Sequence, residues 1–585
     1  MHERDLKLKP FLEAIPDILK YQIATKLILG ILLFLLGRLF RILLNSTGRV
    51  AVSTGDFTFL FGTWQGILII LIAVLSLFFY VALDLNSKII MSKQLLMGED
   101  VDIWRSIDQA IKGVFSLFNL KGLGVIIYIA LVAPLVGIGL SISLTEGFRI
   151  PTFIASVIAS TPLYLALASI AVIIFISIGI ANLFIMHGMV LDKLDVVSAS
   201  RQSRKLVKEN GKDYLNENIM FILSMGAVLG IITGLVLVLP LALTYILPLP
   251  GEVRRGATVF FLLAGVIVSL LAHFCVTPFY VMKMTQLYYK YTTGEVIRYS
   301  ERQVRIRTFD KVGLVCAIIA VIVTSIILNN NFDRFFPLDS TVKIIAHRGG
   351  GVEGAENTVS GLEKASQIGA YGSEIDIQRT KDGYYILNHD GNFARVAGDK
   401  RKPEEMTLAE IRKLSVDGEP IPTFEEILDA SKGKVILFTE LKGETADKQM
   451  CDDAARIIKE RDMIDDVVLI SLKYNLIDYI ETNYPEMQTC YLTFASFGDT
   501  SSLNCDYLAL EEEAATADAI KDVHKKGKKV LVWTANDRDS QHHFFCSSAD
   551  AVITDNVVQA TEVIKEIHNR SDLRRIVDRL REFFS

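Results

Sequence analysis

This 585-residue chain has few cysteines and no net positive charge. Its six cysteines include no Cys-x-x-Cys spacing, which excludes a zinc ribbon or a dithiol site. Its 61 lysines and arginines are balanced by 66 acidic residues, and a formal net charge of −5 makes nucleic acid a poor candidate partner. No cleavable signal peptide is expected, because the first apolar run starts only near Leu27 and no small-residue cleavage site follows it.

Apolar residues, by contrast, are in excess. Hydrophobic residues make up 51% of the chain and the mean hydropathy is +0.37, which is too apolar for an ordinary soluble enzyme. The excess lies in residues 1–330, where long runs approach or exceed the length that crosses about 30 Å of hydrocarbon. We predict a membrane domain with about seven transmembrane helices there. The runs cover residues 27–44, 66–83, 123–144, 162–186, 220–247, 259–280 and 312–328.

The first run is interrupted by Arg38 and Arg41 and could instead lie on the membrane surface. Orientation follows from the loops, because basic loops are retained on the cytoplasmic side. The loops after the second, fourth and sixth runs are rich in lysine and arginine, whereas those after the third and fifth carry Arg149 alone and Arg254 with Arg255. The last run is therefore predicted to end outside, whether or not the first one spans. The domain that follows is expected to be extracytoplasmic.

A different pattern begins at Lys343. Eight short β-rich runs alternate with helix-length segments over about 220 residues, which predicts an α/β domain of the (β/α)8 TIM-barrel type at residues 342–567, after a linker at 331–341. One connection is too short for a parallel crossover. There, Asp382-Gly383 predicts a hairpin that folds residues 384–389 back antiparallel on the second strand. The predicted strands are 343–346, 371–378, 435–441, 467–471, 489–492, 507–510, 530–534 and 551–554.

Carboxylates collect at the predicted carboxyl ends of these strands, where a TIM barrel builds its active site. Glu374 and Asp376 are two apart on one strand and so point to the same face, and Glu440 ends the next strand of the barrel. Three carboxylates without thiolates predict a site for a hard divalent cation, Ca²⁺ or Mg²⁺, rather than structural zinc.

Cationic and titratable side chains lie beside them. Arg348 offers a planar fork and Lys442 a point charge for a phosphate, and Trp533 lies at another strand end. His347 and His389 are candidates for general acid and base. A hairpin turning at Asp382-Gly383 places His389 opposite Asp376, and a loop one residue earlier places it opposite residues near Glu374.

In order along the chain, these motifs resemble those of the glycerophosphodiester phosphodiesterases. The resemblance covers roughly residues 342–567 and implies metal-dependent hydrolysis of glycerophosphodiesters to glycerol 3-phosphate and an alcohol. It also implies metal ligation by Glu374, Asp376 and Glu440, with acid and base roles at His347 and His389. The motifs are His347-Arg348-Gly349, Glu356-Asn357-Thr358, Glu374-Ile375-Asp376, His389-Asp390, Glu440-Leu441-Lys442, Trp533-Thr534-Ala535-Asn536 and Ile553-Thr554-Asp555.

The membrane half resembles, by architecture, the multi-span domain that precedes such catalytic domains in some bacterial proteins. Ala355, Ala535 and Val557 depart from common motif residues without removing a catalytic group, which puts substrate choice rather than activity in doubt. A tethered active site favours substrates in lipids or teichoic-acid-like polymers that contain glycerophosphate, with membrane lipids as further partners.

Several alternatives remain open from the sequence. The chain could be a lipid or polyol-phosphate transporter or flippase, or a membrane sensor, with an appended binding or processing domain, and it could form a homo-oligomer. Residues 568–585 predict an amphipathic helix that either docks on the barrel or a partner, or lies on the membrane. Cys490 and Cys505, near the ends of consecutive predicted strands, could form a disulfide.

Overall fold

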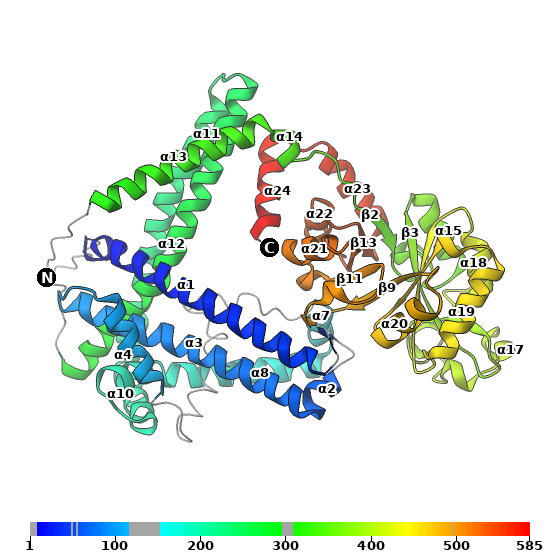
Figure 1. The fold of residues 1–585 in the computed structure, drawn as a ribbon, viewed down its shortest axis with the longest axis horizontal. Helices are drawn as coiled ribbons and strands as arrows, with labels where there is room; N and C mark the ends of the chain where they lie inside the picture. Colours follow the sequence, from blue (N-terminus) through cyan, green and yellow to red (C-terminus); the bar gives the residue numbers. More distant parts are fainter. Residues whose placement is uncertain are drawn as a thin grey trace. The chain divides into compact units, whose positions relative to one another are not determined.

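The computed structural model describes residues 9–47, 49, 51–53, 57–115, 152–294, 308–494 and 496–584. The described residues belong to two compact units. One falls within Met1–Leu39, Ile67–Arg149 and Ala155–Asn331, and the other within Phe40–Gly66, Ile150–Ile154 and Phe332–Ser585. Figure 1 shows long helices in the first unit and a helix-wrapped sheet in the second.

Long apolar helices make up most of the first unit. Five helical stretches in the described part of the chain are long and apolar enough to cross a membrane: Ala14–Asn45, Trp64–Leu96, Pro162–Leu191, Val196–Ile246 and Gly251–Thr293. They contain the first, second, fourth, fifth and sixth predicted runs. The seventh run, residues 312–328, overlaps a shorter apolar helix, Val315–Asn330, and the third lies outside the described residues.

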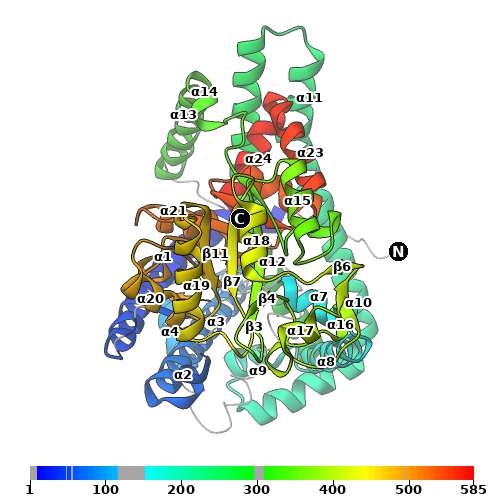
Figure 2. The ribbon, with the colours of Figure 1, turned by 90° about the vertical axis from the view of Figure 1, so that its right-hand side faces the viewer.

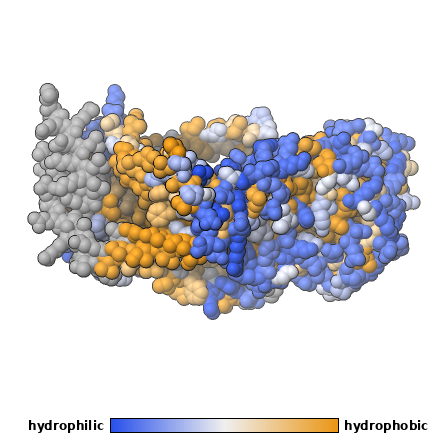
Figure 3. Space-filling model, turned by 90° about the horizontal axis from the view of Figure 1, so that it is seen from above, coloured by the Kyte–Doolittle hydropathy of each residue, from blue (hydrophilic) through white to orange (hydrophobic). Residues whose placement is uncertain are grey.

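The helices before the barrel are α1 (Lys9–Asn45), α2 (Phe57–Gly62), α3 (Trp64–Leu96), α4 (Ile103–Phe115), α7 (Thr152–Ser160), α8 (Pro162–Ala181), α9 (Ile185–Leu191), α10 (Val196–Thr233), η3 (Gly234–Val238), α11 (Leu239–Ile246), α12 (Gly251–Thr293), α13 (Thr308–Asn330) and α14 (Phe332–Phe335). Large apolar side chains on their surfaces are exposed, among them Leu163, Ile173 and Ile319. Figure 3 shows hydrophobic surface gathered over the helices of this unit, whereas the barrel surface is mostly hydrophilic. Such a surface is stable in hydrocarbon rather than in water.

Eight parallel strands form a closed barrel in the second unit, as predicted. The sheet order is β2-β13-β12-β11-β9-β8-β7-β3, and β2 also pairs with β3, which closes the barrel. Figure 2 shows its strands surrounded by helices. The strands are β2 (Lys343–Ala346), β3 (Gly372–Arg379), β7 (Ile436–Leu441), β8 (Val467–Ser471), β9 (Gln488–Thr493), β11 (Tyr507–Glu511), β12 (Lys529–Trp533) and β13 (Ala551–Thr554).

Short strands lie outside the closed barrel. The predicted hairpin is present as β4 (Tyr385–Leu387), which pairs antiparallel with β3. Two further pairs join β5 (Ser415–Val416) to β6 (Glu419–Pro420) and β1 (Ala51–Ser53) to β10 (Ser496–Gly498). β1 precedes α2 in the chain, so it brings a distant segment into the barrel unit.

The β3–β4 hairpin is shifted by one residue from the register expected for a two-residue turn at Asp382-Gly383. Arg379 lies opposite Tyr385, and the Asn388 N–H donates to the Asp376 carbonyl at 3.1 Å. Asn388, not His389, is therefore opposite Asp376. The cause is a five-residue loop centred on Asp382, with Gly383 in the left-handed region at φ +87°. This is the alternative that brings His389 opposite residues near Glu374.

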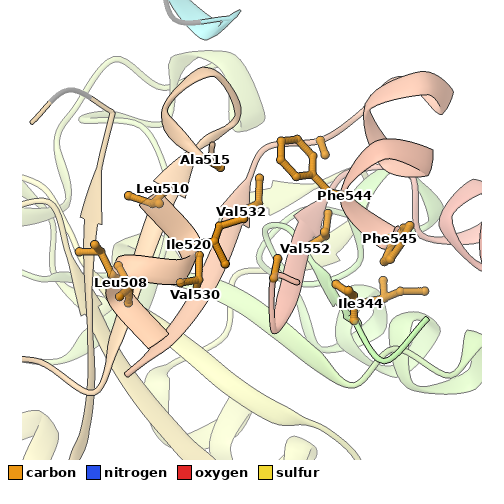
Figure 4. Packing of buried hydrophobic residues seen from close by; sticks show 14 of the residues in the cluster. Ile344, Leu508, Leu510, Ala515, Ile520, Val530, Val532, Phe544, Phe545 and Val552 are labelled. Carbon is orange, nitrogen blue, oxygen red and sulfur yellow. The ribbon is translucent and has the colours of Figure 1, made fainter. Parts of the chain in front are cut away.

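Helices cover the barrel and bury its apolar core. Figure 4 shows one layer of that core, where Val530, Val532 and Val552 on the strands pack against Ile520 and Phe544 on the helices. The helices are α15 (Val359–Ile368), α16 (Ala394–Ala397), α17 (Leu408–Ile411), α18 (Phe424–Ser431), α19 (Lys448–Glu460), α20 (Tyr474–Asn483), α21 (Ala517–His524), α22 (Arg538–Phe545), α23 (Val557–His568) and α24 (Asp572–Phe584), with short 3₁₀ turns at Gly351–Glu353, Pro403–Glu405, Ile464–Asp466, Thr500–Ser502 and Glu512–Ala514.

The C-terminal helix α24 docks within the second unit. Arg575, which is buried, donates to the carbonyl of Phe336 and pairs with Asp333 at 2.7 Å. Ile576 is buried on the same helix. The polar contacts tie α24 to the segment that leads into β2. Cys490 and Cys505 are both free thiols in this structure.

Candidate active site

The strand ends of β2, β3 and β7 bring the predicted site residues together. His347 follows β2 directly, Glu374 and Asp376 lie in β3, and Glu440 lies in β7 opposite Asp376. β3 and β7 run parallel and share a barrel wall, so residues in register on them are neighbours. Lys442 comes one residue after β7 ends.

Three buried carboxylates form the centre of the site. One oxygen from each of Glu374, Asp376 and Glu440 lies within 4.8 Å of the others, and each side chain is almost fully buried. Lys442 Nζ donates to Asp376 at 2.8 Å and to Glu440 at 3.0 Å. The Asn357 side chain both donates to the Asp376 carboxylate and accepts from its backbone N–H. Neighbours therefore hold Asp376 in one orientation.

The charges of this group do not balance. Burial, and next the neighbouring Asp376 charge, raise the pKa of Glu374. Burial also raises the pKa of Glu440, although the Lys442 charge opposes this. For Asp376 burial acts in the same direction, but Lys442 and His389 outweigh it and lower its pKa. One lysine thus faces three carboxyls, and either a bound proton or a cation must supply the missing positive charge. An all-oxygen donor set fits a hard divalent cation.

Each histidine has its own carboxylate. His347 Nδ1 lies 2.7 Å from Asp555 Oδ1, and His389 Nδ1 lies 2.8 Å from Asp390 Oδ1. The His347 Nε2 is 3.9 Å from Glu374, beside the carboxylate group. A carboxylate at Nδ1 fixes the orientation of each ring and directs Nε2 to the other side, toward Glu374 in His347 and toward the Arg348 guanidinium in His389.

Arg348 contacts both the carboxylate group and His389. Its backbone N–H donates to Glu374 at 2.8 Å, while its guanidinium donates to His389 Nε2 at 2.9 Å. The guanidinium also lies 3.6 Å from Glu356. Its Nε is buried and has no hydrogen-bond partner among the described residues. An unsatisfied buried donor of this kind is suited to an anionic ligand.

A tight backbone contact positions the His347 loop. Gly351 has φ +64°, and a Cβ there would lie 2.1 Å from the carbonyl oxygen of Asp555. The Gly351 N–H donates to the His347 carbonyl at 2.8 Å, and the Val352 N–H donates to the Asp555 carbonyl at 2.8 Å. Only glycine fits this approach, which places the loop after β2 against the end of β13.

Trp533 ends β12, opposite Glu511 on β11. Its indole N–H donates to the carbonyl of Ala509 at 3.2 Å, which fixes the ring at the same end of the barrel. The fixed indole presents an apolar face at a strand end.

The sequence reasoning assigned no role to four residues that position the site: Asp555, Asp390, Asn357 and Asn536. Asn536 donates to the Asp555 carboxylate and accepts from its backbone N–H. All four belong to the motifs quoted above, but only Asp555, which follows β13, and Asp390, which follows His389, are adjacent to a strand end or an assigned residue. That adjacency was the available signal.

A second cluster of potential metal ligands lies on α22 and α24. It comprises His542, Cys546 and Asp578. The Arg570 guanidinium donates to both Cys546 and Asp578 at 2.9 Å. The Arg570 guanidinium already pairs with two of these three groups, so the β3–β7 carboxylates are the better metal site.

Comparisons with known proteins agree with the motif order. A family model described as the membrane domain of glycerophosphoryl diester phosphodiesterase matches residues 5–327. Another, described as the glycerophosphoryl diester phosphodiesterase family, matches residues 347–559. Together the two models cover both halves of the chain.

Individual relatives match the barrel half. A glycerophosphodiester phosphodiesterase of Caldanaerobacter subterraneus is 25% identical over 232 residues, which is 36% of this chain and 93% of that protein. Glycerophosphodiester phosphodiesterase 1 of Homo sapiens is 25% identical over 264 residues, or 38% of this chain and 80% of that protein. An Oleispira antarctica phosphodiesterase, solved with the product sn-glycerol-3-phosphate, is 24% identical, covers 38% of this chain and 96% of its own, and has a TM-score of 0.36. The chain belongs to the glycerophosphodiester phosphodiesterase family, in the form that carries an N-terminal membrane domain, and is a phosphoric diester hydrolase.

Proposed function

We propose that the chain hydrolyses glycerophosphodiesters to glycerol 3-phosphate and an alcohol at the outer face of a membrane, with a divalent cation held by Glu374, Asp376 and Glu440. The observation that carries this proposal is the buried carboxylate group with too little positive charge around it. The relative from Oleispira antarctica, whose structure contains sn-glycerol-3-phosphate, supports the choice of product.

Ca²⁺ and Mg²⁺ are the metals that suit three carboxylates without a nitrogen or sulfur ligand. When bound, such an ion would act as a Lewis acid toward the phosphoryl oxygens. The remaining chemistry comes from side chains. Arg348 would bind a phosphate oxygen through its unpartnered Nε, and Lys442 would stabilise the charge that develops on the phosphorane.

His347 and His389 would carry the protons. One ring would remove a proton from the attacking oxygen, and the other would protonate the departing alcohol. Asp555 and Asp390 hold the two rings through Nδ1, so Nε2 is the atom of each ring that would transfer the proton. In His389 this atom accepts from Arg348, which would have to release it when substrate binds. Trp533 would pack against the glycerol or the alcohol.

A metal-binding measurement tests the metal assignment directly. We expect purified full-length protein to bind one equivalent of Ca²⁺ or Mg²⁺ in equilibrium dialysis and to lose hydrolysis in excess EDTA. Glu440→Gln should lose that binding. Glu444→Gln is the matched control, because this carboxylate lies on the loop after β7 but is largely exposed and pairs with Lys402. Equal binding by both variants would remove Glu440 from the metal site.

The outer orientation rests on the distribution of basic residues and has one further support. β1 lies between the first two apolar helices and pairs with β10 of the barrel unit, from which we infer that the loop between these helices and the barrel share one side of the membrane. That loop carries only Arg49, whereas the next one carries many basic residues. The positive-inside rule therefore favours the outside for both.

Cysteine labelling in intact cells tests this orientation. Lys364→Cys, exposed on α15, should react with an impermeant maleimide, and Lys208→Cys, exposed on α10, should react only after lysis. The native free thiols require the unsubstituted chain as the control. Labelling of Lys208→Cys but not Lys364→Cys in intact cells would invert the orientation.

A further inference from the structure

The loop between the first two apolar helices contributes a strand to the barrel unit. β1 runs antiparallel to β10, with Ala51 opposite Gly498, Val52 opposite Phe497 and Ser53 opposite Ser496. Strand addition of this kind uses main-chain hydrogen bonds and is a common mode of docking between segments. Nothing in the phosphodiesterase chemistry requires it.

β10 belongs to the catalytic end of the barrel. It starts three residues after β9 ends at Thr493. β9 runs parallel to the strands that carry the site, so its carboxyl end lies at the same end of the barrel as those of β3 and β7. In a TIM barrel the loops at this end surround the active site. β1 therefore holds one of the loops at the mouth of the barrel.

A buried contact and a charge interaction support this docking. Ala51 is buried in the apolar cluster that also contains Tyr491, Leu503 and Leu508 of the barrel. The positive charge of Arg41, near the end of α1, also acts on the Asp499 carboxylate. Burial acts to raise the pKa of Asp499, but hydrogen bonds from Ser501 and Ser502 and the charges of Lys526 and Arg41 lower it.

The covalent connections on both sides of β1 are short. Five residues separate Asn45, at the end of α1, from Ala51, so this connection reaches at most about 20 Å. On the other side the chain passes through α2 (Phe57–Gly62) and enters the apolar helix α3 at Trp64. Residues 40–66, which include both flanking helix ends, belong to the same compact unit as the barrel.

We propose that β1, joined to α1 and α3 by short connections, is a clamp that holds the mouth of the barrel toward the membrane surface at which α1 ends and α3 begins. This inference rests on the proposed phosphodiesterase function and narrows its substrate to glycerophosphate esterified to an alcohol anchored in the membrane. Hydrolysis would add water across the phosphorus–oxygen bond, leave the protonated alcohol in the membrane and release glycerol phosphate. A mouth held at the surface raises the effective concentration of such a substrate without any additional contact.

The first part of the test establishes the strand pairing in membranes. The double variant Val52→Cys/Phe497→Cys should form a disulfide on mild oxidation, because facing residues of antiparallel strands have Cα atoms about 4.5–5.5 Å apart. Peptide mass spectrometry would identify the linked pair. Val52→Cys/Lys364→Cys is the control that should not link. Failure of the facing pair to link more than this control would overturn the proposal.

The second part measures hydrolysis of two substrates by full-length protein. Val52→Pro removes an N–H from the short strand and should weaken the pairing. We expect its kcat/KM on soluble glycerophosphocholine to stay within about twofold of wild type. Release of glycerol phosphate from vesicles of phosphatidylglycerol and phosphatidylcholine should fall by roughly tenfold or more, since tethering gains of that order or larger are usual. The oxidised Cys pair should keep both rates.

A second variant covers the case in which Val52→Pro does not fold. Two flexible Gly-Ser insertions of 20 residues, one after Thr47 and one between Ser53 and Phe57, keep the strand but lengthen both connections to roughly 25 Å on average. They should lower the vesicle rate and leave the soluble rate unchanged. An unchanged vesicle rate in both variants would overturn the clamp. Absence of hydrolysis of either substrate by wild type would instead contradict the phosphodiesterase function itself.

Discussion

Asp555 offers the sharpest test of how the site works, because it touches neither the carboxylate group nor the predicted phosphate position. Its Oδ1 lies 2.7 Å from His347 Nδ1, and its other oxygen accepts from Asn536. Asp555→Asn keeps the shape but replaces a charged acceptor with an amide. The His347 ring would lose its orientation and its preferred tautomer.

The size of the effect follows from the bond that is lost. A hydrogen bond to a charged group contributes about 1.5–3 kcal/mol, and each 1.36 kcal/mol corresponds to a tenfold change in rate. We therefore expect kcat to fall by roughly 10- to 150-fold. Metal affinity should change little, because Asp555 is not part of the carboxylate group. KM for a soluble diester should also be nearly unchanged.

The same strand supplies a matched control. Asp550 directly precedes β13, as Asp555 directly follows it, and Asp550 also bonds a histidine, His524, at 2.8 Å. Asp550→Asn thus makes the same chemical change at the opposite end of the barrel and should leave kcat intact. Steady-state hydrolysis of glycerophosphocholine, with melting temperatures for both variants, is the assay. Equal kcat values for the Asp555→Asn variant and wild type would refute the positioning role.

The choice of leaving group distinguishes the general acid from the general base. His347→Ala and His389→Ala should each lower the hydrolysis rate of an alkyl diester by roughly 10²- to 10⁴-fold, but on a p-nitrophenyl diester, whose leaving group needs no acid, the loss should shrink for one of the two variants only. Equal losses on both substrates for both variants would contradict the acid–base pair. Glu374→Ala should weaken Ca²⁺ or Mg²⁺ binding by roughly tenfold or more in equilibrium dialysis, and unaltered binding would exclude it as a ligand. Gly351→Ala should destabilise the barrel by about 1–2 kcal/mol and lower kcat, because the alanine Cβ would displace the Asp555 backbone. An unchanged melting curve and an unchanged kcat would argue against the close approach of Gly351 to Asp555. Burial raises the pKa of Glu512 to about 7, so the folded state loses stability as pH rises from about 4.5 to 7. Glu512→Gln should therefore stabilise the protein by about 1–3 kcal/mol at pH 8 but not at pH 4. Denaturation curves of the variant and wild type that do not diverge with pH would show that this pKa is normal.

Periodicity and turn signals were sufficient to predict the barrel. All eight predicted strands coincide with observed ones within about two residues, because buried parallel strands are short apolar runs bounded by turn residues. The hairpin was predicted too, but not its register. A change of one residue in the loop around Asp382 alters every pairing, and local sequence does not determine it.

The site could be predicted in its reacting groups but not in its supports. Glu374, Asp376 and Glu440 were expected together because parallel strand ends meet at one face. Asp555 and Asn536 act through contacts between strands β12, β13 and β2, which lie far apart along the chain. The strand pair β1–β10 was not predicted either. β1 has three residues and lies between apolar helices, too short for a periodic signal.

The central claim, that this site hydrolyses a glycerophosphodiester through its carboxylates, can be tested by following one substrate by ³¹P NMR. Purified full-length protein with Ca²⁺ or Mg²⁺ should convert glycerophosphocholine to glycerol 3-phosphate and choline, and Glu440→Gln should not. Appearance of phosphocholine and glycerol, or conversion by the Glu440→Gln variant at the wild-type rate, would contradict the account.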